Sequence, residues 1–315
     1  MRNRTTAGDT GRLFPALAIA GALAISISAC GGSTAATQVA AAPEAAASIV
    51  VESMAPEPSA ESTTQVDQEI WFAGFKVALG AATAEITEGR GGTVAIEAMF
   101  ENTGSEDGRF DGSLNLASAG ENATEAMDMD IPSVPGGQTG KGTFVFNVED
   151  SFTFDDAVLT IGLAENQQAI VPLTATAGTA VTQEPVAVTA TGEGTADTLK
   201  LELLGGESRA DQPWNHGQMK KGTFVLTVNY DATFLSDFAG GFAFTGENVA
   251  LKLPDGTTVG TIQDGDSQSI ELIGPESTAK HLFSRFEIED PAAGEYALLV
   301  RSFDDAEDEI PFTIR

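Results

Sequence analysis

The sequence contains few of the residues on which enzyme chemistry most often depends. It has one cysteine and two histidines in 315 residues. A single cysteine excludes a disulfide bond within the chain, so the folded state has to be stabilised by the burial of apolar side chains. His216 and His281 do not have the spacing of a metal-binding pair, and the chain lacks the Gly-x-Ser-x-Gly motif of serine hydrolases.

Positive charge is scarce as well. The chain has 16 lysines and arginines against 46 aspartates and glutamates, which gives a net charge of −30 at pH 7. Such a surface repels nucleic acid and anionic lipid head groups, so we expect no nucleic-acid partner. It favours solubility in an extracellular or salty medium, and it concentrates cations near the protein.

The N-terminus is the most informative part of the sequence. A basic beginning with three arginines precedes residues 13–29, which are all apolar or small. This order predicts a secretory signal peptide over residues 1–29. The alternative is a membrane-spanning helix, but a run of 17 residues rich in alanine, glycine and serine is at the short limit for a span.

The end of this segment, Ile27-Ser28-Ala29-Cys30, resembles the lipoprotein signal of bacteria. The resemblance implies cleavage before Cys30 and a lipid on its thiol, which would anchor the protein in the cell membrane. We expect the chain to face the extracellular side, or the periplasm in a cell with an outer membrane. The membrane is therefore the first expected partner.

Residues 30–66 consist mostly of alanine, serine, threonine, proline, glutamate and glutamine. This segment cannot bury enough apolar surface to offset the entropy that is lost on ordering. The composition therefore predicts a flexible tether between the membrane and the folded part of the chain.

Short segments in which apolar and polar residues alternate follow the tether. The clearest are 93–102, 142–148 and 223–230, and 70–79 also has the composition of a strand. Most are bounded by clusters of glycine, asparagine, aspartate or proline, and no segment after residue 66 predicts a helix of more than two turns. The pattern predicts an all-β fold of the sandwich or barrel type.

The second half of the sequence repeats the first. Residues 135–150 align without a gap with residues 275–290, whereas Thr93 aligns with Thr223, so the second copy contains about ten additional residues in between. The alignment matches apolar positions at a constant spacing: Phe146 with Phe286, Val148 with Ile288, Leu159 with Leu299, and Ile170 with Ile310. The repeat predicts that both copies have the same strand order.

The order of motifs in the first copy resembles a known family. An apolar strand with a glycine (72–77) precedes a long alternating strand that ends in Phe-Glu-Asn-Thr-Gly, and a Pro-Gly-Gly-Gln turn leads into Gly-Thr-Phe-Val-Phe-Asn-Val. These features are similar to the uncharacterised immunoglobulin-like domains of lipoproteins from Gram-positive bacteria and archaea, which look similar to a secreted mycobacterial β-sandwich antigen. The resemblance covers roughly residues 68–174 and, less closely, 186–315. It implies no enzymatic activity.

Repeat and resemblance together predict two tandem immunoglobulin-like β-sandwich domains. The first domain is expected over 67–175 and the second over 185–315, with 176–184 as a short polar linker. The glycine pairs Gly205-Gly206 and Gly240-Gly241 predict turns rather than a phosphate-binding loop.

His216 is expected in a turn and His281 at an exposed strand position, so neither is expected to be catalytic. Acidic loops would be the place for calcium, which prefers six to eight oxygen ligands. The weak candidates are Asp264, Asp266, Asp304 and Asp305. None of them lies in the D-x-[DN]-x-[DN]-G calcium loop, so a solvated acidic surface is the preferred interpretation and no metal or cofactor is expected.

Two groups of aromatic residues would suit a platform for sugar or peptide. They are Trp71, Phe72 and Phe75, and Trp214, Phe238, Phe242 and Phe244. The alternative is that these side chains form the cores, with those of the second group partly covering the core as a lid. We prefer this alternative.

These observations favour a non-catalytic, lipid-anchored cell-surface protein that acts in adhesion, partner binding or envelope organisation. An extracellular protein is then the expected partner. The alternative is a receptor or accessory subunit that captures a cation, a sugar or a peptide, which a converging aromatic or carboxylate pocket would support. An enzyme would require a buried carboxylate pair in a cleft.

Overall fold

The computed structural model describes residues 59–118, 124–262, 270–289, 293–302 and 306–314. All of them belong to one compact unit, Met54–Arg315. They form antiparallel β-sheets, so the expected all-β fold is confirmed. Three 3₁₀ turns accompany the strands: η1 (Phe154–Asp156), η2 (Ala175–Ala177) and η3 (Gly246–Asn248). Within the described ranges, no helix is long and apolar enough to cross a membrane.

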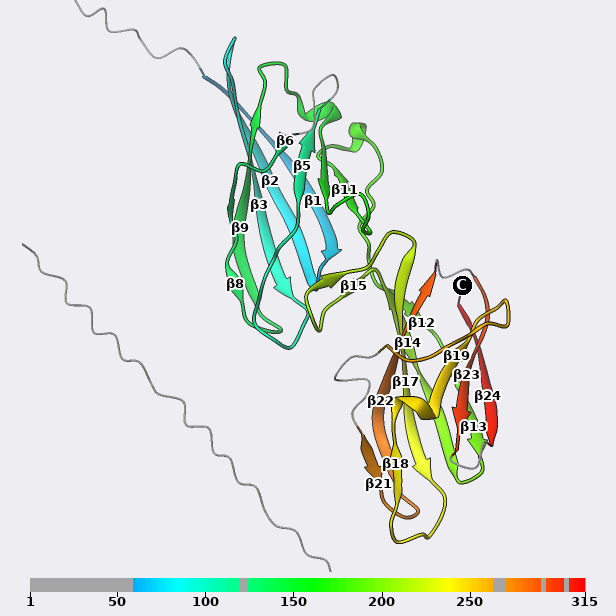
Figure 1. The fold of residues 1–315 in the computed structure, drawn as a ribbon. Helices are drawn as coiled ribbons and strands as arrows, with labels where there is room; N and C mark the ends of the chain where they lie inside the picture. The colour runs from blue at the N-terminus through cyan, green and yellow to red at the C-terminus, as the bar shows by residue number, and fades with distance from the viewer. Residues whose placement is uncertain (1–58, 119–123, 263–269, 290–292, 303–305, 315) are drawn as a thin grey trace, which may run out of the picture. The chain divides into compact units, whose positions relative to one another are not determined.

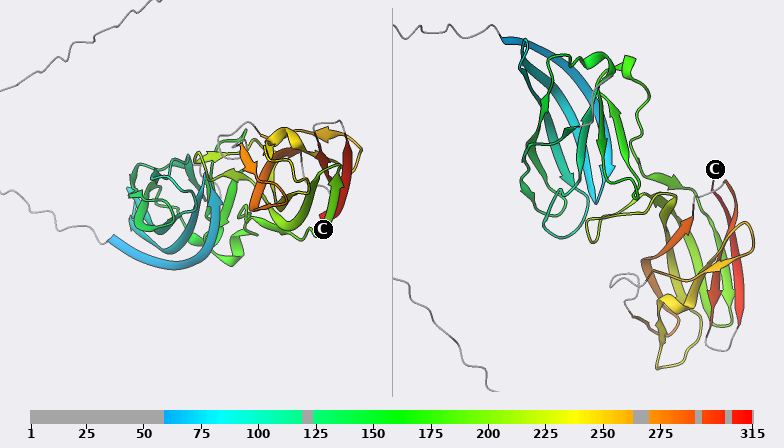
Figure 2. Two further views of the ribbon diagram at one scale, coloured as in Figure 1. Left: turned by 90° about the horizontal axis from the view of Figure 1, so that it is seen from below. Right: turned by 45° about the horizontal axis from the view of Figure 1, so that its top comes forward.

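The N-terminal sandwich consists of two facing sheets around one hydrophobic core (Figures 1 and 2). The sheets have the strand orders β1-β2-β3-β9-β7 and β11-β10-β5-β6. The strands of the first sheet are β1 (Ser59–Phe72), β2 (Phe75–Thr87), β3 (Gly91–Asn102), β9 (Thr139–Val148) and β7 (Asp128–Asp130). Those of the second are β11 (Ala169–Pro172), β10 (Val158–Ile161), β5 (Leu114–Ala117) and β6 (Thr124–Glu125). Two short strands, β4 (Gly108–Arg109) and β8 (Ser133–Val134), pair beside them.

The C-terminal sandwich has the same plan around a second core (Figure 1). One sheet contains β12 (Val186–Val188), β13 (Gly192–Ala196), β14 (Leu199–Arg209), β17 (Thr223–Phe234) and β22 (Thr278–Glu289). The other contains β20 (Thr258–Val259), β19 (Val249–Lys252), β23 (Gly294–Arg301) and β24 (Glu307–Ile314). Two further pairs are β15 (Asp211–Gln212) with β16 (Gly217–Gln218), and β18 (Phe242–Phe244) with β21 (Glu271–Ile273).

The repeat predicted from the sequence is present in the strand order. The series β1-β2-β3-β9 in the N-terminal sandwich corresponds to β13-β14-β17-β22, and β11-β10-β5-β6 corresponds to β24-β23-β19-β20. Both copies therefore bury the same succession of strands, as the alignment of their apolar positions predicts.

The pairing corrects the alignment in two regions, the β10–β11 pair and strand β3. Leu159 pairs with Leu116 and lies in the first core, and its counterpart in the second core is Leu298, which pairs with Leu251. The sequence alignment had matched Leu159 with Leu299, one residue further on. Its match of Ile170 with Ile310 was wrong by one residue as well, because Leu159 pairs with Val171 and Leu298 with Ile310. A shift of one residue moves a side chain to the other face of a sheet, so only the pairing identifies the core position.

The second correction concerns β3 and β17. Phe146 pairs with Val94, and its counterpart Phe286 pairs with Leu226 rather than with Phe224. The sequence alignment was therefore two residues out at this strand. A shift of two residues keeps every side chain on the same face, and for this reason the alternation did not reveal it.

The segment 70–79, which has the composition of one strand, forms a hairpin. Strand β1 ends at Phe72 and β2 begins at Phe75. The two residues between them, Ala73 and Gly74, both have positive φ, 50° and 80°. Positive φ at both central positions is the signature of a tight hairpin turn. Asparagine and glycine are the usual residues of this turn, so Ala73 concealed it in the sequence.

Strand β1 also begins earlier than the composition suggested. It starts at Ser59, inside the segment 30–66 that was expected to be a tether. The polar residues of this part of β1 pair along β2, for example Thr63 with Thr83. An edge strand needs few apolar residues of its own when its neighbour supplies the core, here through Ala82 and Ala84, which are fully buried.

The segment between the sandwiches is attached to the N-terminal one. Val181 forms a β-bridge with Ile170, and the carbonyl of Thr182 accepts a hydrogen bond from the backbone N–H of Trp71 (2.9 Å). The Nε2 of Gln183 donates to the carbonyl of Gln168 (2.8 Å). The residues expected to form a polar linker thus extend the edge of the second sheet.

Candidate functional site

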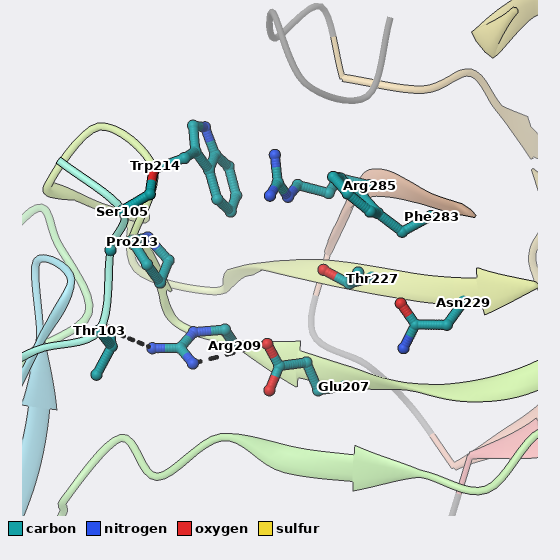
Figure 3. A pocket seen from close by; sticks show the side chains of 11 residues that line it. Thr103, Ser105, Glu207, Arg209, Pro213, Trp214, Thr227, Asn229, Phe283 and Arg285 are labelled. Carbon is teal, nitrogen blue, oxygen red and sulfur yellow. Dashed lines mark hydrogen bonds and ion pairs between the residues drawn. The ribbon is translucent and has the colours of Figure 1, made fainter. Parts of the chain in front are cut away.

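A cavity of about 590 Å³ lies where the outer face of the β14-β17-β22 sheet meets the end of the N-terminal sandwich (Figure 3). We call it the junction cavity. Its lining comes from four places in the sequence: Thr103, Gly104, Ser105, Glu207, Arg209, Pro213, Trp214, Thr227, Asn229, Phe283 and Arg285.

The floor of the junction cavity is set by the register of three strands. Glu207, Thr227 and Arg285 lie side by side on β14, β17 and β22. The neighbouring row consists of Gly205, Asn229 and Phe283 in the same strand order. Residues paired across strands project from the same face of a sheet, so each row presents its side chains together.

Gly205 was expected in a turn, but it lies within β14 at a β-bulge and has a φ of 114°. Gly206 lies beside it in the same strand. A glycine within a strand marks a bulge or a place where space is kept free. Because Gly205 pairs with Asn229, the floor of the cavity has no side chain next to Asn229 on the β14 side.

The wall of the junction cavity is an arginine held between two aromatic rings. The guanidinium carbon of Arg285 lies 3.9 Å from the centroid of the Trp214 ring and 4.6 Å from that of Phe283. Figure 3 shows the indole and the guanidinium facing each other. Stacking against a ring face is favourable for the planar guanidinium and fixes its orientation.

Trp214 reaches this position from a hairpin that joins β14 to β17. Strands β15 and β16 enclose a four-residue turn from Pro213 to His216, in which His216 has a φ of 51°. His216 therefore lies in a turn, as expected. Its ring is 5.2 Å from that of Phe75, and its Nε2 lies 3.1 Å from the Oδ1 of Asn102.

A buried ion pair holds the base of this hairpin. Asp211 is only 1% exposed and accepts from the Nε of Arg209 at its Oδ1 (2.9 Å) and from the Nη2 at its Oδ2 (3.3 Å). The same Oδ2 accepts from the backbone N–H of Gly74 in the N-terminal sandwich (2.8 Å). The Nη2 of Arg209 also donates to the hydroxyl of Thr103 (3.4 Å). One carboxylate therefore orders both the arginine and the turn after β1.

Small residues allow the hairpin to approach the N-terminal sandwich. A Cβ on Gly104 would lie 2.3 Å from the carbonyl oxygen of Pro213, and a Cβ on Gly108 would lie 2.4 Å from the Nε2 of His216. The first contact is with backbone and excludes a larger residue, whereas a larger residue at the second position would require the ring of His216 to move. The side chain of Asn102 lies beneath this contact, and its Nδ2 donates to the carbonyls of Glu106 (2.8 Å) and Val134 (2.9 Å).

Three polar side chains of the junction cavity have unused hydrogen-bonding capacity. Ser105, Thr227 and Asn229 form no side-chain hydrogen bond with any residue in the described ranges. Together with the carboxylate of Glu207, which lies 3.6 Å from the Nη1 of Arg209, they offer donors and acceptors to a polar ligand. The cavity can thus hold a ligand by hydrogen bonds, by charge and by ring contacts.

The positions singled out from the sequence fall in different places. Cys30, Asp264, Asp266, Asp304 and Asp305 lie outside the described residues. His281 is exposed in β22, as expected. In the part of the chain that the structure describes, no group of three or more histidine, cysteine, aspartate or glutamate side chains is arranged to hold a metal ion.

The two aromatic groups are divided between core and surface. Phe72, Phe75, Phe242 and Phe244 are buried in the cores, and Phe238 is 63% exposed. The prediction that these aromatic side chains form the cores is therefore confirmed for four of the seven. Trp214 instead faces Arg285 in the junction cavity, whose lining contains none of the other aromatic candidates.

Sequence reasoning missed Arg209, Arg285 and Asn229. Two signals were available. Arginine is rare in this acidic chain, and residues 227, 229, 283 and 285 occupy half-exposed positions of two alternating strands. The pairing of these strands, which the sequence does not state, brings the side chains together.

No protein-family model and no curated protein match the chain. Among solved structures, it is similar to a conserved hypothetical protein from Bacillus anthracis, with 14% identity and a TM-score of 0.27. That match covers 35% of this chain and 96% of the other.

Proposed function

We propose that this chain is a non-catalytic, lipid-anchored cell-surface protein that binds an extracellular partner through the junction cavity. The lipid on Cys30 would hold it at the membrane, and the residues between Cys30 and β1 would link the anchor to the sandwiches. The observation that carries the binding proposal is the convergence of Trp214, Arg285 and unpaired polar side chains on one concave face.

The composition of the cavity favours binding over catalysis. Its lining has one carboxylate, Glu207, and contains neither histidine nor cysteine. A carboxylate pair of the glycosidase type therefore does not line it, and its only serine, Ser105, has no histidine beside it in the lining. The features present, which are rings, a fixed guanidinium and amide and hydroxyl groups, are those that recur at recognition surfaces.

A second candidate function is the capture of a small ligand for a transporter or enzyme. The cavity volume of about 590 Å³ supports it, because small-molecule sites commonly enclose about 300–1,000 Å³. Asp211 and Glu207 compensate the charge of Arg209, and the lining offers rings, hydroxyl groups and an amide, so we expect a sugar or a peptide rather than a cation. A partner protein and a free small ligand would both use Arg285 and Asn229.

The anchoring part of the proposal is tested by replacing Cys30 with alanine. A diacylglyceryl group supplies two acyl chains, which is enough for stable attachment where one chain is marginal. We expect the Cys30→Ala protein to leave the membrane fraction for the soluble fraction. Membrane fractionation at the wild-type level would contradict the proposal.

The binding part is tested with matched tryptophan variants. The chain has two tryptophans, and each has a cation beside its ring: Arg285 at Trp214 (3.9 Å) and Lys76 at Trp71 (5.4 Å). We expect Trp214→Ala and Asn229→Ala to abolish cross-linking of the full-length protein to its partner on intact cells, and Trp71→Ala to preserve it. Equal cross-linking by all variants would exclude the junction cavity as the recognition surface.

A further inference from the structure

The two sandwiches differ in the connection that follows the last long strand of the first sheet, which is β9–β10 in one copy and β22–β23 in the other. In the N-terminal sandwich, the connection from β9 to β10 carries Phe152 and Phe154, whose rings meet edge to face with centroids 5.3 Å apart. Phe152 is 6% exposed and belongs to the first core. Beside it, the hydroxyl of Ser118 donates to the Oδ1 of Asp156 (2.8 Å) and ties η1 to the end of β5. Two phenylalanines thus close this end.

In the C-terminal sandwich, the sequence of the corresponding connection contains no phenylalanine. This connection, from β22 to β23, is shorter, and its sequence Asp290-Pro291-Ala292-Ala293 contains no aromatic residue. At this end lies a cleft of about 720 Å³, which we call the end cleft. It is lined by Thr223, Leu253, Pro254, Asp255, Thr257, Val259, Glu287, Ile288, Glu289 and Tyr296.

The end cleft corresponds in position to the closed end of the N-terminal sandwich. By strand pairing, Ile288 is the counterpart of Val148, and Leu253 is the counterpart of Ser118. The interior of the cleft is apolar because Leu253, Val259 and Ile288 face the second core. Tyr296, the counterpart of Ala157, places a buried ring in the lining of the cleft. The end that Phe152 and Phe154 close in one copy is therefore a cleft with an apolar interior in the other.

The rim of the end cleft is acidic. Asp255, Glu287 and Glu289 belong to its lining, which contains no lysine or arginine. The nearby Lys252 is engaged elsewhere, since its Nζ donates to the carboxylate of Glu309 (2.7 Å). The backbone N–H of Thr257 donates to Asp255 (2.8 Å), and this hydrogen bond lowers the pKa of Asp255. All three carboxylates are exposed, so they can meet an incoming cation without being desolvated first.

We infer that the end cleft is a docking site for an aromatic side chain flanked by lysine or arginine on a partner protein. The apolar interior matches the ring, because Leu253, Val259, Ile288 and Tyr296 offer aliphatic and aromatic surface to it. The rim matches the flanking cations by charge. A second copy of this chain is a poor occupant, because its net charge of −30 would be repelled. This inference does not depend on the junction cavity, with which the end cleft shares no lining residue.

The test uses the full-length Cys30→Ala protein and two synthetic peptides of equal charge. The probe is acetyl-Arg-Lys-Phe-Lys-Arg-amide, and the control peptide has glycine in place of phenylalanine. Binding is measured by calorimetry at about 0.15 M salt, where distant charges are largely screened. Burial of the ring should make the phenylalanine peptide bind about tenfold more tightly or better. Equal affinity for both peptides would overturn the inference, because attraction to an acidic surface does not distinguish them.

Variants locate the binding. Val259→Trp should fill the cleft and remove the preference for the phenylalanine peptide. Glu287→Gln combined with Glu289→Gln should weaken the binding of both peptides. Glu247→Gln combined with Glu271→Gln removes the same charge outside the lining and should leave both affinities unchanged. If Val259→Trp does not fold by circular dichroism, the two glutamine pairs decide the question. Equal effects of the two pairs would place the binding elsewhere on the acidic surface.

Discussion

Replacing Asp211 with asparagine should destabilise the protein by about 3 kcal/mol. Asparagine keeps the size of the side chain but removes its charge and turns one acceptor into a donor. Arg209, which is 9% exposed, would then lose its buried counter-charge. Removing one partner of a buried ion pair typically costs about 3–5 kcal/mol. We expect the lower end, because Glu207 lies 3.6 Å from Arg209 and retains part of the compensation.

The free energy of unfolding is measured by urea titration of the full-length protein. Arg209→Met combined with Asp211→Asn should recover most of the loss, because the double variant contains no uncompensated buried charge and the amide oxygen of the new side chain can still accept from the backbone N–H of Gly74. Arg301→Met tests an exposed pair with Glu307 (2.7 Å), which should be worth at most about 1 kcal/mol. A loss below about 1 kcal/mol for Asp211→Asn would refute the reasoning.

Three further outcomes are expected. Phe152→Ala should cost about 3–5 kcal/mol in urea unfolding, since it leaves a cavity in the first core; a loss near zero would show that it does not close this end. Gly104→Ala should accelerate proteolysis at the β15–β16 hairpin, because its Cβ would lie 2.3 Å from the Pro213 carbonyl oxygen, whereas Gly260→Ala, with no atom within 4 Å, should not. Burial raises the pKa of Tyr230 in the folded state, so its contribution to stability is complete below pH 10, the ordinary tyrosine pKa, and declines above it. A pH titration of stability should accordingly be flatter above pH 10 for Tyr230→Phe than for the wild type.

The sequence predicts the strands well where the side chains alternate between core and solvent. The interval 93–102 became β3, and 142–148 lies within β9, because each strand has one buried face and a strict period of two. The hairpin turn at Ala73 and Gly74 was missed because one of its two residues is not a usual turn residue. Its conformation is supported by tertiary contacts, including the hydrogen bond from Gly74 to Asp211.

The junction cavity could not be derived from the sequence for a different reason. Trp214 and Arg285 are 71 positions apart and meet only because β22 pairs with β17 and the β15–β16 hairpin folds over that face. Local patterns report which face a residue occupies, not which distant residue shares it. The burial of the Arg209–Asp211 pair could not be predicted either, because charged residues in a strand are normally expected to be exposed.

The differences between the two copies nevertheless point to the sites that a search for motifs does not find. The N-terminal sandwich passes from β2 to β3 through residues 88–90, whereas the C-terminal sandwich passes from β14 to β17 through residues 210–222. The additional residues form the hairpin that carries Asp211 and Trp214, which is the hairpin that contacts the other sandwich and covers the junction cavity. The second difference is a shortening. The β22–β23 connection is shorter than the β9–β10 connection and lacks its two phenylalanines, and the end cleft lies there. In a chain built from two copies of one sandwich, the shared positions maintain the cores. The inserted β15–β16 hairpin and the shortened β22–β23 connection lie outside these shared positions. Binding sites can therefore evolve at both without disturbing either core.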